Sequence, residues 1–279
     1  MRTLLIAATL LASAQTETAD AWGPEGHSIV AEIAQRRLSD EARAGVASIL
    51  GGPGVSLASF GSWADDERAR DKNTSRWHFV NPVRGDTSYD PQRHCQFVKG
   101  QGDCLIAALE REVGRMACDS ETPERRQRAL KFIVHLIGDL HQPLHAIGEE
   151  RGGNGVTVTV DMREGANPRP RFESNLHKVW DETLLQTIAW SWGSYVERLE
   201  IGPLSTADVP SLTVGSVSDW LFEAHRSGLE IFDATPKGST IDDAYRIKME
   251  PVVDRQLAVG GLRLAKLLDK AFAAKQCAS

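Results

Sequence analysis

Histidine and aspartate residues recur four positions apart in two segments of this 279-residue sequence. His135 and Asp139 lie in the segment HLIGDLHQPLH, and His177 and Asp181 lie in NLHKVWDE. On a helix, this spacing places both side chains of a pair on one face. Imidazole nitrogens and carboxylate oxygens are common zinc ligands, so each pair could hold a metal ion. A single pair would more often be a surface hydrogen bond or an ion pair on a helix, but two pairs together favour a metal centre.

Other segments supply further candidate ligands. His145 follows the first pair, just beyond Pro143. Asp65 lies in SWADDER, His78 lies in WHFVNP, and His27 lies in WGPEGH. Alone, such a histidine would more often be a hydrogen-bonded core residue, and such an aspartate a helix cap or a solvated acid. Their occurrence beside the two His/Asp pairs favours the metal centre instead.

The first 21 residues are expected to be a signal peptide. Arg2 gives a basic start, residues 3–14 are apolar or small, and residues 19–21 have the small-x-small form that signal peptidase cuts. A second such site at residues 12–14 leaves the cut position open. Cleavage after Ala21 would make Trp22 the N-terminus, and its free amine and carbonyl could chelate a metal. We therefore expect an exported protein, periplasmic or secreted, with one domain over residues 22–279.

Export bears on the four cysteines, because an oxidising compartment permits disulfides. Cys95 and Cys104 are close in sequence and could cross-link a surface loop. Cys118 and Cys277 could pair only if the fold brings them together. No two cysteines have the Cys-x-x-Cys spacing, so zinc–thiolate and redox sites are not favoured.

The elements that position these residues are mostly helical. Apolar residues recur at helical spacing within residues 30–38, 130–140 and 257–268. Pro143 should end the second of these helices, and Pro251 could begin the third. The run of Val and Thr at residues 156–160 indicates a strand of a β-hairpin between helices. The predicted fold class is mainly α, a single large helical domain with a small β-hairpin insertion.

Composition limits the classes of function. With 41% hydrophobic and 25% charged residues, the chain is neither a disordered protein nor a membrane bundle. No later apolar stretch is long enough to span a bilayer, so no membrane anchor is expected. A formal charge of −6 argues against nucleic-acid binding through a broad basic surface. A binder of polyanions would need another source of positive charge, such as bound metal.

The order of motifs WGxxGH, WAD, HF, HxxxDxxxxxH, GGN and HxxxD resembles the S1/P1 nuclease family of secreted trinuclear-zinc nucleases. The resemblance extends from Trp22 to Asp181. It implies a mainly helical fold with three zinc ions in a cleft, a core that is shared with bacterial zinc phospholipases C.

The resemblance implies a ligand set for each zinc ion. The first ion would be held by Asp65, His78, His135 and Asp139. The second would be held by the amine and carbonyl of Trp22, by His27, and by Asp139 as a bridge. The third would be held by His145, His177 and Asp181. Two close ions could hold a hydroxide for in-line attack on phosphorus, while the third neutralises the leaving oxygen.

The resemblance also implies substrate contacts. Arg68 would brace the transition-state phosphoryl group, completing a catalytic set with Asp65 and Asp139. Phe79 would stack on a base, which favours single strands, with Gly152 and Asn154 in the loop beside it. Asn81 replaces an aspartate of the better-known fungal and plant members, so base preference or affinity could differ.

Three further histidines are not assigned to the metal. His141 lies on the wrong helix face for the Asp139 site and is expected either to be structural or to support a ligand residue without binding metal itself. His94 and His225 match no motif, and we expect both at the surface.

The sequence thus predicts a zinc-dependent endonuclease that hydrolyses single-stranded DNA and RNA to 5′-phosphorylated products. It would also have 3′-nucleotidase activity and act on nucleotides, as a monomer without a stable protein partner. One alternative is a phospholipase C with the same ions. Asp181 argues against it, because the phospholipases have Glu there, and so does the lack of an amphipathic membrane-binding stretch. The other alternative is a non-catalytic exported zinc-binding protein, although structural zinc sites are normally closed to water.

Overall fold

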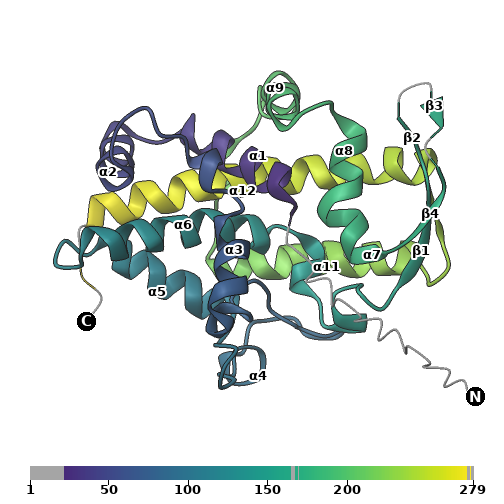
Figure 1. The fold of residues 1–279 in the computed structure, drawn as a ribbon, viewed down its shortest axis with the longest axis horizontal. Helices are drawn as coiled ribbons and strands as arrows, with labels where there is room; N and C mark the ends of the chain where they lie inside the picture. Colours follow the sequence, from purple (N-terminus) through teal and green to yellow (C-terminus); the bar gives the residue numbers. More distant parts are fainter. Residues whose placement is uncertain (1–21, 165–166, 169, 275–276, 278–279) are drawn as a thin grey trace, which may run out of the picture.

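The computed structural model describes residues 22–164, 167–168, 170–274 and 277. The predicted signal peptide, residues 1–21, lies outside the described residues. Helices make up most of the structure, and a small sheet lies at one end of it (Figure 1). The predicted mainly α fold is therefore confirmed. No helix in the described part of the chain has the length and apolar character needed to cross a membrane.

The elements of the N-terminal half are α1 (Pro24–Gln35), α2 (Asp40–Leu50), η1 (Leu57–Phe60), α3 (Trp63–Arg70), η2 (Lys72–Thr74), α4 (Pro91–His94), α5 (Leu105–Ala117) and α6 (Pro123–Leu140). The middle of the chain contains the short helices η3 (Pro143–Ala146), η4 (Glu149–Arg151), α7 (Leu176–Lys178), η5 (Val179–Thr183) and α8 (Leu184–Ile188). The strands are β1 (Thr157–Asp161), β2 (Arg163–Glu164), β3 (Asn167–Pro168), β4 (Phe172–Asn175) and β5 (Thr240–Asp242). The remaining helices are α9 (Trp192–Ile201), α10 (Val209–Leu212), α11 (Val217–Ala234) and α12 (Asp243–Ala274).

Helix α6 is the central element of the fold. Every residue from Phe132 to Leu140 is buried, because α1, α3, α5, α11 and α12 all contact this helix. A helix that is surrounded in this way has apolar residues on all faces, as α6 does after its charged first turns. Its polar residues His135 and Asp139 are therefore held in a dry environment. As predicted, the helix ends before Pro143, which begins η3 instead.

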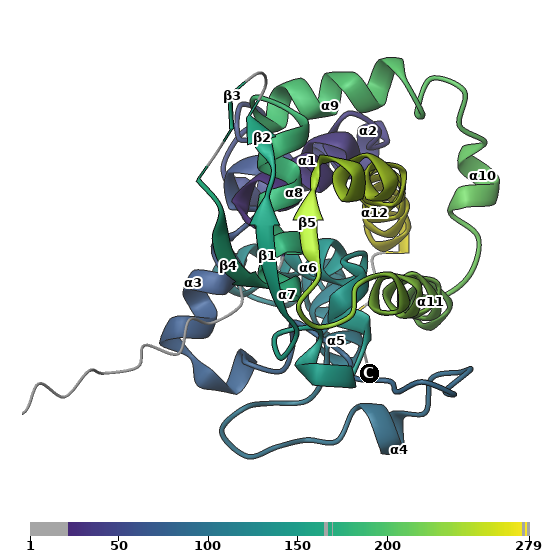
Figure 2. The ribbon, with the colours of Figure 1, turned by 90° about the vertical axis from the view of Figure 1, so that its right-hand side faces the viewer.

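The predicted hairpin is part of a three-stranded sheet. Strand β1 pairs antiparallel with β4, with Thr157 opposite Asn175. On its other edge, β1 pairs in parallel with β5, a strand that the sequence reading missed. The short strands β2 and β3 pair with each other. Figure 2 shows this sheet beside the N-terminal end of α12, because β5 directly precedes that helix. Strands β1 to β4 lie between η4 and α7 in the sequence.

The expectation that Pro251 begins the last helix is wrong. Helix α12 begins at Asp243, because the Asp242 carboxylate accepts a hydrogen bond from the Tyr245 amide at 2.9 Å and so caps the helix. Pro251 lies inside α12 and leaves the carbonyl of Ile247 without its usual helical partner. Ile247 is 61% exposed, so water can hydrate that carbonyl.

Both cysteine pairs are disulfides. Cys95 is bonded to Cys104 across the loop that follows α4. Cys118, at the end of α5, is bonded to Cys277, 159 residues away in sequence. The tertiary fold therefore supplies the proximity that the sequence left open, and the second bond ties the C-terminal segment to the start of the α5–α6 connection.

Candidate functional site

Eight predicted ligand side chains converge from different elements on one buried region. They are His27 on α1, Asp65 on α3, His78 after η2, His135 and Asp139 on α6, His145 on η3, His177 on α7 and Asp181 on η5. Their donor atoms form three groups that could each hold a metal ion: His27 with His135 and Asp139, Asp65 with His78 and His135, and His145 with His177 and Asp181.

The Asp139 carboxylate lies between the first two groups. Its Oδ2 is 3.1 Å from both His78 Nδ1 and His135 Nε2, and its Oδ1 is 3.5 Å from His27 Nε2. The two nitrogens of His78 and His135 are 3.0 Å apart. One carboxylate thus offers an oxygen to each of two neighbouring positions, which is the arrangement expected of a bridging ligand.

The third group is formed beyond the end of α6. His177 Nε2 lies 3.3 Å from Asp181 Oδ2, and His145 Nε2 lies 4.0 Å from Asp181 Oδ1. A π-helical turn, η5, continues α7 and keeps His177 and Asp181 on one face. Trp22, the predicted main-chain ligand, is buried. The amide of the next residue, Gly23, donates to the Asp181 carbonyl at 2.8 Å, so the main chain at Trp22 lies near the third donor group.

Backbone carbonyls orient three of the imidazoles. His135 Nδ1 donates to the Gly61 carbonyl at 2.7 Å, and His145 Nδ1 donates to the His78 carbonyl at 2.7 Å. His177 Nδ1 donates to the Gly152 carbonyl at 2.6 Å. Because Nδ1 of each ring carries the proton that is donated to a carbonyl, Nε2 is the nitrogen that faces the cluster. Metal-binding histidines are commonly fixed in this way.

The donor set fits a cation. His27 Nε2, His145 Nε2 and Asp139 Oδ1 are buried atoms without a hydrogen-bond partner among the described residues. Burying a polar atom without a partner costs about 1–3 kcal/mol, so several such atoms facing one another would destabilise the fold. Positive ions between these atoms would satisfy all of them.

Burial sets the protonation of most of the histidines. It lowers the pKa of His27, His78 and His145 well below the ordinary value, and it lowers the pKa of His177 to about 4. These rings are therefore neutral at pH 7, which is the form of imidazole that binds metals.

The carboxylates respond in the opposite direction. Burial raises the pKa of Asp139 to about 6 and raises that of Asp181 well above its usual range. Burial would lower the pKa of His135, but the Asp139 and Asp65 carboxylates outweigh it and raise that pKa to about 9. A proton at His135 thus compensates the buried acids when no metal is present. A divalent cation would replace this proton and keep the donors in their metal-binding forms.

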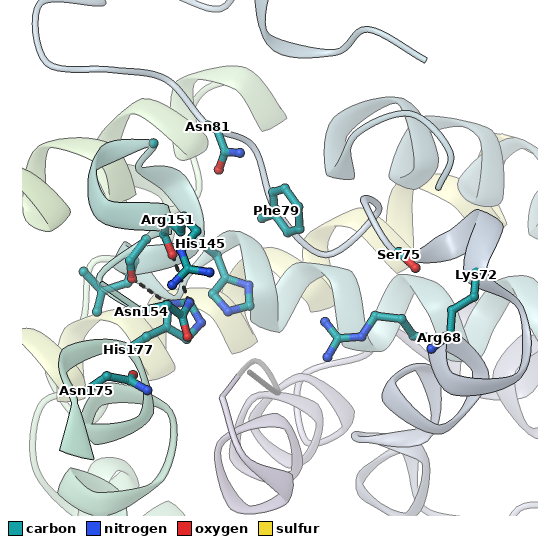
Figure 3. A pocket seen from close by; sticks show the side chains of 13 residues that line it. Arg68, Lys72, Ser75, Phe79, Asn81, His145, Arg151, Asn154, Asn175 and His177 are labelled. Carbon is teal, nitrogen blue, oxygen red and sulfur yellow. Dashed lines mark hydrogen bonds between the residues drawn. The ribbon is translucent and has the colours of Figure 1, made fainter. Parts of the chain in front are cut away.

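A cleft of about 660 Å³ lies over the cluster (Figure 3). It is lined by Arg68, Lys72, Ser75, Phe79, Asn81, Leu144, His145, Gly148, Arg151, Gly152, Asn154, Asn175 and His177. Arg68 and Lys72 lie on one wall, and Arg151, Asn154 and Asn175 lie on the opposite wall (Figure 3). Two members of the third donor group thus form part of the cleft surface.

The predicted substrate residues all line this cleft. Phe79 and Asn81 follow His78 on a segment that is held against η3, because the Val80 amide donates to the His145 carbonyl at 3.0 Å. Asn154 is oriented by its own hydrogen bond, Nδ2 to the Arg151 carbonyl at 2.9 Å.

Comparisons with known proteins agree with this geometry. The S1/P1 Nuclease family model matches residues 22–273. The chain belongs to the S1/P1 nuclease family. It is 31% identical to Nuclease P1 of Penicillium citrinum over 89% of this chain and 97% of the relative. It is also 31% identical to Nuclease S1 of Aspergillus oryzae, over 96% and 97%, and 29% identical to Endonuclease 2 of Arabidopsis thaliana, over 90% of each. The protein is therefore a nuclease, a hydrolase of phosphoester bonds that acts on nucleic acid.

In this S1/P1 nuclease, Gln142 contacts the proposed metal site, a contact that the sequence reading missed. Its side chain is fully buried, and its Nε2 donates to Asp181 Oδ1 at 2.5 Å. Its Oε1 accepts from the Leu144 amide at 2.6 Å, so one side chain joins the third donor group to the η3 turn. The signal was present in HQPLH, where a glutamine stands between two histidines just before the helix-breaking proline.

The expectation that His94 and His225 lie at the surface is wrong. His94 is 7% exposed; its Nδ1 accepts from the Asp90 amide, and its Nε2 donates to Asp86. His225 is 1% exposed and donates from Nδ1 to the Ala146 carbonyl at 2.7 Å. In each ring Nδ1 has a backbone partner, which lowers the cost of burying the imidazole.

His141 contacts structural partners, which favours the first of the two predicted alternatives. Its Nδ1 donates to the Ile137 carbonyl at 2.8 Å, and its Nε2 accepts from Arg263 at 3.1 Å. Burial, together with the Arg263 charge, lowers the pKa of His141 to about 3. The ring therefore stays neutral and ties α6 to α12.

Gly138 is the second residue that only the structure reveals. A Cβ at this position would lie 2.4 Å from His27 Nδ1, and His27 cannot retreat freely because its ring stacks on His135 with centroids 3.9 Å apart. We expect Gly138→Ala to displace His27, because overpacking a dense site costs about 1–3 kcal/mol. The measurements are the metal content and kcat/KM, and kcat/KM should fall about tenfold or more.

The matched control for Gly138→Ala is Gly193→Ala in α9. The nearest atom to a Cβ there is 4.0 Å away, so this change should be neutral or slightly stabilising. Normal metal content and activity in Gly138→Ala would show that the close approach to His27 is not required.

Proposed function

We propose that this S1/P1 nuclease is a zinc-dependent endonuclease that hydrolyses single-stranded DNA and RNA to 5′-phosphorylated products and also has 3′-nucleotidase activity. The observation that carries the proposal is the position of the donor groups. They are buried, yet His145 and His177 line a cleft that also contains Arg68 and Phe79. A closed structural zinc site would not share its ligands with a substrate cleft.

The proposed ligand sets follow the three donor groups. Asp65, His78, His135 and Asp139 would hold one zinc ion, and His145, His177 and Asp181 would hold another. His27 and Asp139 would hold the remaining ion together with the main chain of Trp22, whose amine becomes free only if the chain is cut after Ala21. When bound, the zinc ions would activate water and neutralise charge that develops on the phosphate.

Residues of the cleft wall would then bind and orient the substrate. The Arg68 guanidinium points into the cleft (Figure 3), where it can donate two hydrogen bonds to the phosphoryl oxygens in the transition state. Phe79 is part of the same cleft and offers a ring face to a base. A base within a duplex has no free face, so stacking on Phe79 would select single strands.

Phe79→Ala is expected to raise KM for single-stranded DNA about tenfold, because stacking of a base on an aromatic ring contributes about 1–3 kcal/mol. Zinc content should stay normal, since Phe79 belongs to no donor group. Steady-state kinetics with metal analysis check both statements. Phe97→Ala is the control, because that ring is 71% exposed and does not line the cleft. Loss of metal in Phe79→Ala would contradict the stacking role.

A substrate panel tests the proposed function. The zinc-loaded protein should cleave single-stranded DNA and RNA, act more slowly on duplex DNA, release phosphate from 3′-nucleotides, and leave phosphatidylcholine intact. Analysis of the products should find phosphate at the 5′ ends. Hydrolysis of phosphatidylcholine without nucleic-acid cleavage would instead favour a phospholipase C.

Export and a monomeric state are part of the proposal. Residues 1–21 would be removed on secretion to the periplasm or the medium, and the mature domain would begin at Trp22. Intact mass of the secreted protein tests the cut, and sedimentation tests the monomer.

A further inference from the structure

The cleft is lined by more cationic side chains than the one that is assigned to the scissile phosphate. Among its described lining residues, Arg68, Lys72 and Arg151 are cationic and none is acidic, although the whole chain has a net charge of −6. Arg68 is already assigned to the transition-state phosphoryl group. The remaining two cations add to a local field that attracts a polyanion.

Arg151 is held in an unusual backbone conformation. Glu150 and Arg151, with φ of 46° and 57°, are the two non-glycine residues with positive φ in the described part of the chain. Gly152 and Gly153 continue the same left-handed run, with φ of 67° and 87°. Each non-glycine residue in this region costs about 1–2 kcal/mol, and such strain persists only where the surroundings enforce it.

Hydrogen bonds enforce this turn and connect it to the site. The Gly152 amide donates to the Glu149 carbonyl at 2.9 Å, and the Gly155 amide donates to the Glu150 carbonyl at 2.9 Å. The Gly152 carbonyl accepts from His177 at 2.6 Å, and the Arg151 carbonyl accepts from Asn154 at 2.9 Å. The backbone of Arg151 is thus fixed relative to both the third donor group and Asn154.

The Arg151 side chain is available to a ligand. It is exposed, lines the cleft, and forms no ion pair with any residue in the described ranges. Figure 3 shows Arg151 and Arg68 on opposite walls of the cleft, with the cleft between them. A strand that crosses the cleft, with its scissile phosphate braced by Arg68, could present a neighbouring phosphate to Arg151.

We propose that Arg151 binds a phosphate of the substrate strand other than the scissile one, so that this nuclease prefers oligonucleotides to a single phosphodiester. The inference rests on the proposed function, because it assumes hydrolysis of single strands in this cleft. Arg151 would then set the preference for longer substrates, whereas other residues perform the reaction.

The test compares two substrates of the zinc-loaded Arg151→Gln protein. Thymidylyl-thymidine contains only the scissile phosphate, whereas a long oligothymidylate also contains flanking ones. For the oligonucleotide, kcat/KM should fall about tenfold, because an arginine–phosphate hydrogen bond contributes about 1.5–3 kcal/mol. The slope of log kcat/KM against log salt should become shallower by about 0.7. For the dinucleotide, kcat/KM should stay within about twofold of the unchanged protein.

Two further variants sharpen the result. Arg151→Lys should restore the salt slope but only part of the rate, because lysine keeps the charge and loses the planar fork. Arg226→Gln removes an exposed cation from α11 and should leave kcat/KM unchanged for both substrates. Zinc content and melting temperature of each variant verify that the site is intact.

Two outcomes overturn the inference alone: an equal loss on both substrates, which would assign Arg151 to the scissile phosphate, or no loss on the oligonucleotide. An unchanged protein that cleaves neither substrate would instead overturn the proposed function, and the inference with it.

Discussion

Asp139→Asn is expected to lose metal and to lower kcat/KM at least a hundredfold. The Asp139 side chain is fully buried, and its two oxygens face different donor groups, at 3.1 Å from His78 and His135 and 3.5 Å from His27. An amide of the same shape supplies one neutral oxygen in place of a shared negative charge. Even changes beyond the ligands themselves typically cost 10–100-fold in metal affinity or activity, so loss of a bridging ligand should cost about that much or more.

The measurement for Asp139→Asn is zinc per chain by elemental analysis, alongside kcat/KM on single-stranded DNA. Asp66→Asn is the matched control, because Asp66 follows a proposed ligand in sequence but is exposed. That variant should keep its metal and its activity. A metal-replete and fully active Asp139→Asn protein would refute the bridging site.

Removal of zinc is expected to abolish hydrolysis and to destabilise the fold. The donor groups contain several buried carboxylates, and burial raises the pKa of both Asp139 and Asp181, whereas His135 supplies only one compensating positive charge when the metal is absent. Each bound ion stabilises the native state by about 2.7 kcal/mol when its free concentration is a hundred times its dissociation constant. With about 2–4 °C per kcal/mol for a domain of this size, we expect the melting temperature to fall by about 10 °C or more.

The zinc experiment follows three states of one preparation: as purified, after chelation and dialysis, and after zinc is restored. Activity and melting temperature should fall together and return together. Activity that persists in demonstrably metal-free protein would contradict zinc catalysis. A melting temperature that responds to zinc, in a protein that never cleaves any substrate of the panel, would support a non-catalytic zinc-binding protein.

The donors and much of the helical framework could be predicted from the sequence, because both depend on short-range patterns. A spacing of four puts His135 and Asp139 on one helix face wherever that helix lies. The apolar composition around them predicts a buried helix, and the proline after them predicts its end. The motif order from WGxxGH to HxxxD was enough to suggest the family, since it depends on residue type and sequence order alone.

Predictions from short-range patterns failed where the outcome depends on contacts that form only in the folded protein. Pro251 looked like a helix start, but α12 begins earlier, because Asp242 caps it and the exposed position of Ile247 leaves its carbonyl open to water. His94 and His225 looked like surface residues, but backbone partners from folded turns allow both to be buried. The strand β5 could not be foreseen, because it is short and pairs with β1 from about 80 positions away in sequence.

Only the tertiary structure decided how the candidate residues meet. Packing of α1 on α6 puts the His27 ring against Gly138, where nothing larger than hydrogen fits without a shift. The left-handed turn at Glu150 and Arg151 places the Arg151 side chain on the cleft wall opposite Arg68. These relations join residues that are far apart in the chain, and their distances depend on how whole elements pack. Residue type and local spacing therefore determined which chemistry this protein can perform, whereas packing determined where its groups stand.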